Sequence, residues 1–154
     1  MLRVARPEDA PPLAALINDA FQVEAFFKIG DRTSADEIVE LMREGEFLVL
    51  EEGDEMTGCV YVACRGERAY FGMLAIAPSK QGKGLGRRVI EAVEARAREH
   101  GCRFMDIHIV NLREELPAYY QRLGYTEQGE LPFSHPERAS RPCHFIVMAK
   151  AISP

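Results

Sequence analysis

The stretch that decides the fold reads Pro78-Ser79-Lys80-Gln81-Gly82-Lys83-Gly84-Leu85-Gly86-Arg87-Arg88. It lies between an apolar segment that ends at Ile76 and a long amphipathic pattern that predicts a helix. The first N–H groups of a helix have no partner inside the helix, and the helix dipole makes that end positive. Glycines let an anion approach the backbone, and the basic side chains add positive charge. The stretch therefore predicts a binding site for a pyrophosphate group.

Two other glycine-rich motifs were compared with this stretch, and each is excluded by one residue. A Walker loop requires Gly-Lys followed by Ser or Thr, whereas Gly82-Lys83 is followed by Gly84. A dinucleotide fingerprint requires a third glycine, and Arg87 occupies that position after Gly82 and Gly84. A plain structural loop is the remaining alternative, but it does not account for the four basic residues and the three alternating glycines.

Outward from this loop, hydrophobic periodicity predicts a mixed sheet with helices on its faces. Short turns at 52–54 and 66–67 predict antiparallel hairpins, and the strand–helix–strand unit over 69–109 predicts a right-handed crossover between two parallel neighbours. A capping box, Ser34-Ala35-Asp36-Glu37, predicts the start of the second helix. We expect strands at 2–6, 47–51, 57–65, 69–76, 103–109, 125–130 and 143–150, and helices starting at Pro7, Ser34, Leu85 and Leu116.

Composition restricts the class of protein. A chain of 154 residues, 47% hydrophobic and 28% charged, fits a single domain over 1–154. It contains no apolar run of the roughly 20 residues that a membrane span needs, and Met1 to Pro7 do not resemble a signal peptide. The net charge of −5 argues against nucleic acid as a partner. The four cysteines have no zinc-site spacing and are expected to be reduced thiols in a cytoplasmic protein.

Four segments together resemble a known family. Gln81-x-x-Gly84-x-Gly86 is similar to the Q/R-x-x-G-x-G/A motif of the GNAT superfamily of acetyl-CoA-dependent N-acyltransferases. The opening segment 3–10, the strand 73–78 and Tyr120-Gln121-Arg122-Leu123-Gly124-Tyr125 also resemble family elements, in the same order. The resemblance covers nearly the whole chain. It implies the GNAT α/β fold, with about seven strands, four helices and a splayed parallel pair at the coenzyme site.

The resemblance implies acetyl-CoA as cosubstrate and no metal. Backbone N–H groups of the glycine loop would hold the pyrophosphate, and the strand before the loop would pair with pantetheine as an extra strand. An asparagine of many relatives contacts the coenzyme, although Asn111 is separated from Tyr120 by a longer loop here. The implied coenzyme-binding residues are Leu74, Ala75, Ile76, Gln81, Gly82, Lys83, Gly84, Leu85, Gly86, Arg87 and Asn111.

The resemblance also implies a proton donor. Tyr120 occupies the position of the family tyrosine that protonates the departing thiolate, and the alternatives are that it packs or only hydrogen-bonds the coenzyme sulfur. The family's common glutamate base is missing, because the strand 69–76 contains no acid. Glu24 or His108 could serve as the base, or a water chain, or no base at all if the amine arrives neutral. Tyr119 is interpreted as core or pocket wall.

The acceptor site is predicted at two segments. The resemblance implies that Phe21 to Phe27 with Asp31-Arg32 close over the acceptor, and Phe133 to Arg138 is the other candidate acceptor loop. His135 is more typical of a surface histidine than of a base. The predicted activity is transfer of acetyl to a primary amine of a small molecule or peptide, by direct attack in a ternary complex, in a monomer or homodimer. The alternatives are a non-catalytic CoA-binding regulatory module and an O-acylating or antibiotic-modifying enzyme.

Overall fold

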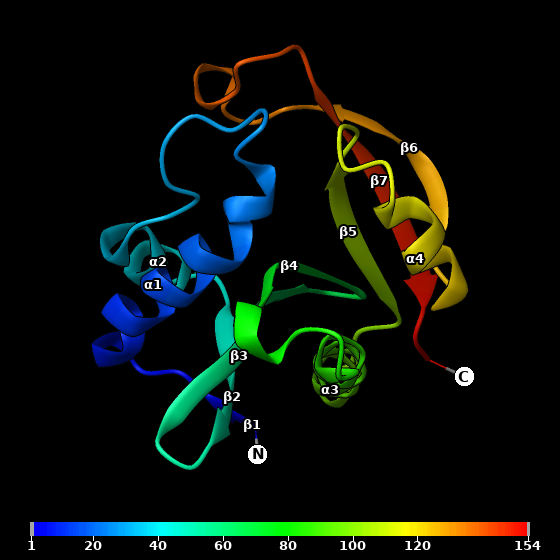
Figure 1. Ribbon diagram of the computed structural model, residues 1–154. Helices are drawn as coiled ribbons and strands as arrows, with labels where there is room; N and C mark the ends of the chain where they lie inside the picture. The colour runs from blue at the N-terminus through cyan, green and yellow to red at the C-terminus, as the bar shows by residue number, and fades with distance from the viewer. Residues whose placement is uncertain (1, 154) are drawn as a thin grey trace.

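A computed structural model describes residues 2–153, so Met1 and Pro154 of the predicted domain lie outside the described residues. Residues 2–153 form one seven-stranded sheet with the strand order β1-β2-β3-β4-β5-β7-β6, together with four α-helices (Figure 1). This confirms the predicted α/β fold. No helix within residues 2–153 is long and apolar enough to cross a membrane. The strands are β1 (Leu2–Val4), β2 (Glu46–Glu52), β3 (Glu55–Arg65), β4 (Arg68–Ile76), β5 (Phe104–Val110), β6 (Thr126–Pro132) and β7 (His144–Ala151).

The helices and strands follow one another in the predicted order: one strand, two helices, three strands, a helix, a strand, a helix and two strands. The four α-helices are α1 (Ala10–Ala20), α2 (Ala35–Leu41), α3 (Leu85–Glu99) and α4 (Leu116–Arg122). Four short 3-10 segments accompany them: η1 (Pro7–Asp9), η2 (Phe21–Glu24), η3 (Pro78–Lys80) and η4 (Pro136–Arg138). The first strand is shorter than the predicted 2–6, because Pro7 begins η1 and Ala5 only continues the pairing through one bond to Phe47.

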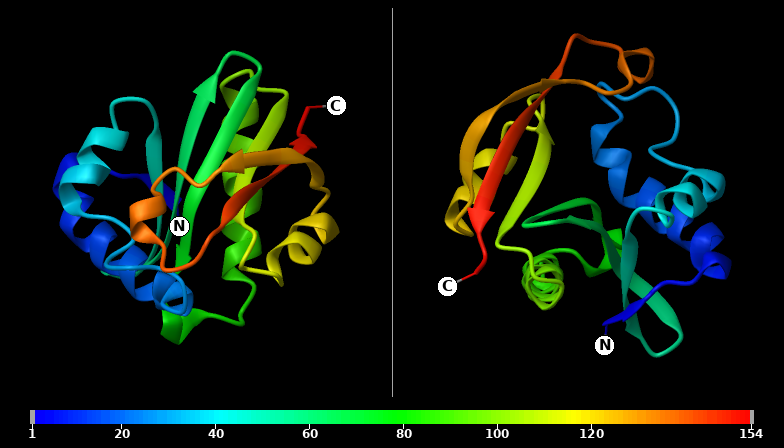
Figure 2. Two further views of the ribbon diagram at one scale, coloured as in Figure 1. Left: turned by 90° about the horizontal axis from the view of Figure 1, so that it is seen from above. Right: turned by 180° about the vertical axis from the view of Figure 1, so that it is seen from behind.

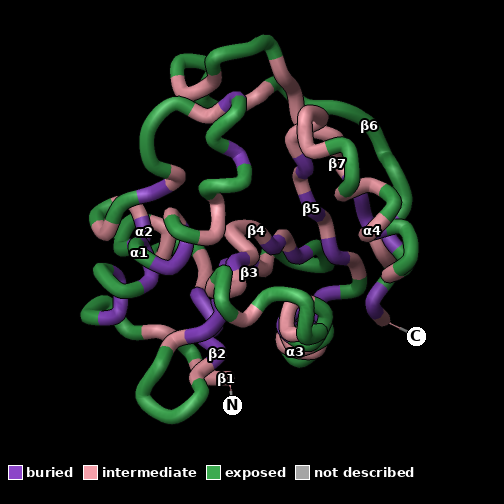
Figure 3. Tube along the Cα trace, viewed as in Figure 1, coloured by how far each residue is buried: buried purple, intermediate pink, exposed green. Residues whose placement is uncertain are grey.

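Two apolar layers cover the two faces of the sheet. Side chains alternate along β2 and β3, so Leu48 and Val60 face α3 while Phe47 and Cys59 face α1 and α2. Figure 2 shows α1 and α2 on one side of the sheet and α3 on the other. The edge strand β6 is exposed along its whole length, in contrast to the buried central strands (Figure 3). The core is therefore centred on β2, β3 and β4.

The start of α2 differs in detail from the predicted capping box. Ser34 caps the helix as predicted, its Oγ accepting the Glu37 N–H at 3.2 Å. The Glu37 carboxylate, however, accepts the hydroxyl of Thr33 at 2.6 Å. Thr33 is buried, and it also exchanges two bonds of 3.0 Å with the side-chain amide of Asn18 on α1. The segment before α2 is thus fixed to α1 at Thr33.

The parallel strands β4 and β5 separate soon after they meet. They pair only over Arg68–Tyr70 and Phe104–Asp106, although both strands continue beyond this point. A bulge in β4 places two residues opposite one on β3, and Met73 within it has a left-handed φ of 51°. β5 is paired with β7 along its full length. The backbone of β4 after Tyr70 therefore faces an opening between the two halves of the sheet (Figure 1).

Candidate functional site

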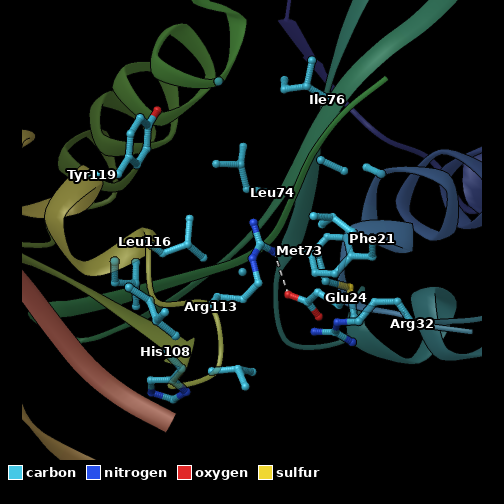
Figure 4. A pocket seen from close by; sticks show the side chains of 18 of the residues that line it. Phe21, Glu24, Arg32, Met73, Leu74, Ile76, His108, Arg113, Leu116 and Tyr119 are labelled. Carbon is cyan, nitrogen blue, oxygen red and sulfur yellow. Dashed lines mark hydrogen bonds and ion pairs between the residues drawn. The ribbon is translucent and has the colours of Figure 1, made fainter. Parts of the chain in front are cut away.

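A cavity of about 1000 Å³ lies where β4 and β5 separate. One part, here called the loop half, is lined by residues from 74–87 and 116–123. The other part, the lid half, is lined by residues from 19–32, 108–113 and 133–138, together with Tyr70. Figure 4 shows side chains from both halves pointing into the same space. The cavity therefore joins the segment after β4 to the two segments predicted to close over an acceptor.

The glycine loop enters α3 without a side-chain cap. Gly84 is the N-cap residue with φ 78°, Gly82 has φ 79°, and both are in the left-handed region that disfavours side chains. An added Cβ at either glycine would meet nothing within 4 Å, so the space in front of the loop is open. The Gln81 amide donates to the Ile76 carbonyl at 3.1 Å and ties the loop to β4. The first N–H groups of α3 are therefore free to bind an anion.

Positive charge surrounds this loop. Lys80, Arg87 and Arg122 line the loop half, and no carboxylate of residues 2–153 lines it with them. Lys80 pairs with Glu52 at 3.7 Å, and Arg87 pairs with Glu91 at 3.2 Å. Neither glutamate lines the cavity. The loop half therefore matches a polyanionic ligand in charge as well as in backbone geometry.

The cavity contains most of the predicted coenzyme-binding residues. Leu74, Ala75 and Ile76 line it beside the glycine loop, and so do all residues from Gln81 to Arg87 except Lys83. Lys83 is exposed. Asn111 is not among the lining residues, because its side-chain oxygen accepts the backbone N–H of His144 at 2.9 Å. Its backbone N–H also donates to the His144 carbonyl, so Asn111 extends the β5–β7 ladder, and its contact with the coenzyme stays a prediction.

Tyr120 is buried on the cavity wall. Burial raises the pKa of its hydroxyl, with a further increase from Tyr119 and a small opposing effect of Arg113. Its ring packs edge-on against those of Tyr119 and Tyr125. The hydroxyl has no hydrogen-bond partner among the described residues. Tyr120 is therefore a protonated phenol whose donor is available to a ligand.

Glu24 is buried and ion-paired. Its Oε2 lies 2.9 Å from Nη1 of Arg113, which belongs to the segment between β5 and α4, and Figure 4 shows this pair crossing the cavity. The Nε atom of Arg113 pairs in turn with the exposed Glu115 at 2.9 Å. The side chains of Glu24 and Arg113 are only 9% and 16% exposed, so the pair is shielded from solvent. Glu24 thus joins the two walls of the cavity electrostatically.

Two histidines lie in the lid half in different surroundings. His108 is half-buried between the rings of Tyr70, at 4.8 Å, and Phe145, at 5.6 Å. Burial lowers its pKa, and nearby Asp106 partly opposes this, so the imidazole is neutral at pH 7. His135 is exposed and pairs with Glu137 at 3.3 Å, which fits the surface histidine that the sequence suggests.

The two lid segments are joined to each other. Lys28 and Ala139 form an isolated antiparallel bridge, and the Ile29 N–H donates to the Arg138 carbonyl at 2.7 Å. The Ser140 N–H donates to the Phe27 carbonyl at the same distance. Residues 21–33 and 133–140 therefore act as one cover, which we call the lid.

Sequence reasoning missed two features of the site. Arg113 lies in Leu112-Arg113-Glu114-Glu115, a charged run that reads as a solvated turn, yet its side chain is largely buried. The bulge at Met73 has no signal, because nothing marks a methionine as the residue that adopts a left-handed φ.

A family model and a curated protein that match this sequence are both described as acetyltransferases. Residues 43–127 match a family model described as an acetyltransferase (GNAT) domain. A Pseudomonas phage PaMx11 protein, 5-NmdU N-acetyltransferase, is 30% identical over 89 residues, which span 56% of this chain and 61% of the phage protein.

Solved structures share the fold. The ribosomal-protein-S18-alanine N-acetyltransferase of Escherichia coli aligns with a TM-score of 0.81 at 17% identity, over 100% of this chain and 94% of its own. The structure of yncA from Salmonella typhimurium contains its cofactor acetyl-CoA and aligns with a TM-score of 0.74 at 20% identity, also over 100% and 94%.

Proposed function

The chain belongs to the GNAT family of acetyltransferases, and we propose that it transfers an acetyl group from acetyl-CoA to a primary amine. The observation that carries this proposal is the uncapped N-terminus of α3, which opens into the cavity next to the unpaired part of β4. One surface thus offers N–H groups for a pyrophosphate and a free strand edge for an extended chain. The acceptor is a small molecule or a peptide that reaches the lid half.

The coenzyme occupies the loop half in this proposal. Its pyrophosphate binds the N–H groups from Gln81 to Gly86, and Lys80 and Arg87 add positive charge. Its pantetheine arm pairs with the backbone of Leu74 to Ile76, where β5 has turned away. The acetyl-CoA in the yncA structure supports this choice of ligand for the shared fold.

The chemistry is a direct acyl transfer. The amine nitrogen attacks the thioester carbonyl, a C–N bond forms, and the C–S bond then breaks with its electron pair on sulfur. A backbone N–H near Leu74 stabilises the oxyanion, a contribution worth about 10²–10³ in rate. The Tyr120 hydroxyl donates a proton to the departing sulfur, and the attacking nitrogen loses one to a base.

The base is assigned by the surroundings of its candidates. Glu24 was a candidate, but its carboxylate is held by Arg113, so we assign it to shaping the lid half rather than to proton transfer. His108 is neutral at pH 7 because burial lowers its pKa, and it faces the cavity. We therefore propose that His108 or a water next to it takes the proton, unless the amine arrives neutral.

The four cysteines are free thiols, which supports a cytoplasmic setting.

A thiol-release screen tests this function. Purified protein is mixed with acetyl-CoA and a panel of amines, amino acids, polyamines, aminoglycosides and peptides, with free CoA as the readout. 5-NmdU belongs in the panel because the phage relative is named for it. Release of CoA with formation of an N-acetylated product supports the proposal. Tight acetyl-CoA binding without turnover of any acceptor would point instead to a non-catalytic binding module.

A further inference from the structure

Arg32 is a cation without a carboxylate partner in the lid half. It is half-buried, lies between η2 and α2, and lines the cavity. None of the residues 2–153 forms a hydrogen bond or ion pair with its guanidinium. Its guanidinium carbon lies 5.4 Å from the centroid of the Phe21 ring. All five N–H donors of this group are therefore available to a ligand.

The backbone beside Arg32 is held in place. The next residue, Thr33, exchanges two backbone bonds of 3.0 Å with the side chain of Asn18, and its hydroxyl bonds Glu37. The Phe21 ring also contacts the guanidinium through a cation–π interaction. An arginine fixed at its backbone and stacked on an aromatic ring loses little conformational freedom on binding. These contacts indicate a preorganised binding group rather than a mobile surface side chain.

The other cations of the lid half already have partners. Arg113 is engaged by Glu24 and Glu115, Arg138 lies 3.5 Å from Glu37, and the Lys28 ammonium donates to the Gly30 carbonyl. Figure 4 shows Glu24 between Arg113 and Arg32, but its ion pair is with Arg113. The remaining acids of this half, Asp19 and Asp31, are exposed to solvent. A positive charge without a partner is therefore left at Arg32.

We propose that the acceptor amine carries an oxyanion, a carboxylate or a phosphate, and that Arg32 binds this group. This inference rests on the proposed acetyl transfer. The planar guanidinium fork binds either oxyanion through two parallel hydrogen bonds, which orients the acceptor while its amine reaches the thioester. A polyamine without an acidic group would bring only like charge to Arg32 and is disfavoured as the acceptor.

Matched acceptor pairs test this specificity. Free amino acids are compared with their α-amides, and O-phosphoethanolamine with ethanolamine, so that each pair differs only in the oxyanion. A bidentate charged contact predicts a preference of about 10- to 100-fold in kcat/KM for the anionic member of at least one pair. The pair that shows it identifies the oxyanion. Arg32→Gln should reduce this ratio to near unity.

The control variant is Arg141→Gln. Arg141 also stacks on a lid phenylalanine, Phe26, at 5.4 Å, but it does not line the cavity. It should keep the preference of the unchanged protein. If the anionic and neutral members of both pairs turn over equally well, the inference is wrong while acetyl transfer itself stands.

A binding measurement covers the case in which no acceptor turns over. N-acetylated amino acids and O-phospho-N-acetylethanolamine, with their neutral counterparts, are titrated calorimetrically into the CoA-saturated protein. The inference predicts about 10-fold tighter binding of an anionic member, lost in Arg32→Gln and kept in Arg141→Gln. Equal binding within both pairs would overturn it, whether or not the acetyl-transfer screen succeeds.

Discussion

At the scale of single residues, the cavity contains two side chains whose polar groups are in opposite situations. Tyr120 is a buried residue whose hydroxyl has no hydrogen-bond partner among residues 2–153, whereas the buried Glu24 carboxylate is paired with Arg113 through Oε2. A free donor is suited to a ligand atom that gains negative charge, and an engaged carboxylate is suited to holding two walls together. Mutations of the two residues should therefore affect different quantities.

Tyr120→Phe should lower kcat by about 10²–10⁴, because it removes the donor for the departing thiolate and leaves the ring packing intact. The dissociation constant of acetyl-CoA should change little, and steady-state kinetics together with calorimetry measure both. Tyr61→Phe is the matched control, since it removes a buried hydroxyl that bonds the Leu41 carbonyl on the far face of the sheet. Full kcat in Tyr120→Phe would exclude its role as acid.

Removing one member of the Glu24–Arg113 pair should destabilise the fold. Arg113→Gln leaves the buried Glu24 carboxylate without its partner, which costs about 3–5 kcal/mol. Glu24→Gln should cost less, because Arg113 keeps its ion pair with Glu115. Because the two losses share one cause, the double variant should be less destabilised than the sum of the two single ones. Urea unfolding of the four proteins measures this cycle. Additive losses would mean that the pair is not a coupled unit in solution.

At the scale of elements, side chains near the N-terminus fix the first strand to its surroundings. Arg3 on β1 donates to Asp9 at 2.8 Å and to Glu51 of β2 at 2.8 Å. Asp9 also accepts the Arg6 N–H at 2.8 Å, which caps η1. The hydrogen bond from Arg3 lowers the pKa of Asp9 from 3.8 to about 2, against an opposing effect of burial. The Arg3 guanidinium thus ties β1, β2 and the segment just before α1 together.

Asp9→Asn should lower the free energy of unfolding by about 2 kcal/mol at pH 7. Asp9 has a lower pKa in the folded state than in the unfolded one, so its contribution is present above about pH 4. It is lost as the pH falls through about 2. Denaturant unfolding of both proteins from pH 7 to pH 2 should show the difference shrinking in that interval. A difference that does not vary with pH would contradict the ion-pair account.

Elements with a strong local pattern were predictable from the sequence. The stripe of Leu85, Val89, Val93 and Ala97 predicts α3. The last three residues are buried against the sheet, and Leu85 is partly buried. The separation of β4 from β5 was implied by resemblance alone, because the bulge at Met73 depends on tertiary pairing that no local propensity encodes. Arg113 was missed for a similar reason. Its burial follows from a partner 89 residues away, Glu24, rather than from its neighbours.

At the scale of the whole molecule, charge is distributed unevenly. The chain carries a net charge of −5, yet the loop half of the cavity is lined by basic side chains without a carboxylate from the described residues. The two parts of the sheet are joined through only three parallel residue pairs, and the cavity opens where this pairing stops. The separation of the strands and the basic side chains both lie at the glycine loop. Our central claim is therefore that this loop binds the pyrophosphate of acetyl-CoA.

Calorimetric titration of acetyl-CoA into Gly84→Asp tests that claim most directly. The variant places a carboxylate at the helix N-terminus, and the account predicts a loss of affinity of about 100-fold or more. Gly66→Asp is the control, because its φ of 62° imposes comparable backbone strain in a turn outside the cavity lining. It should bind acetyl-CoA like the unchanged protein. Unchanged affinity in a folded Gly84→Asp would contradict the account.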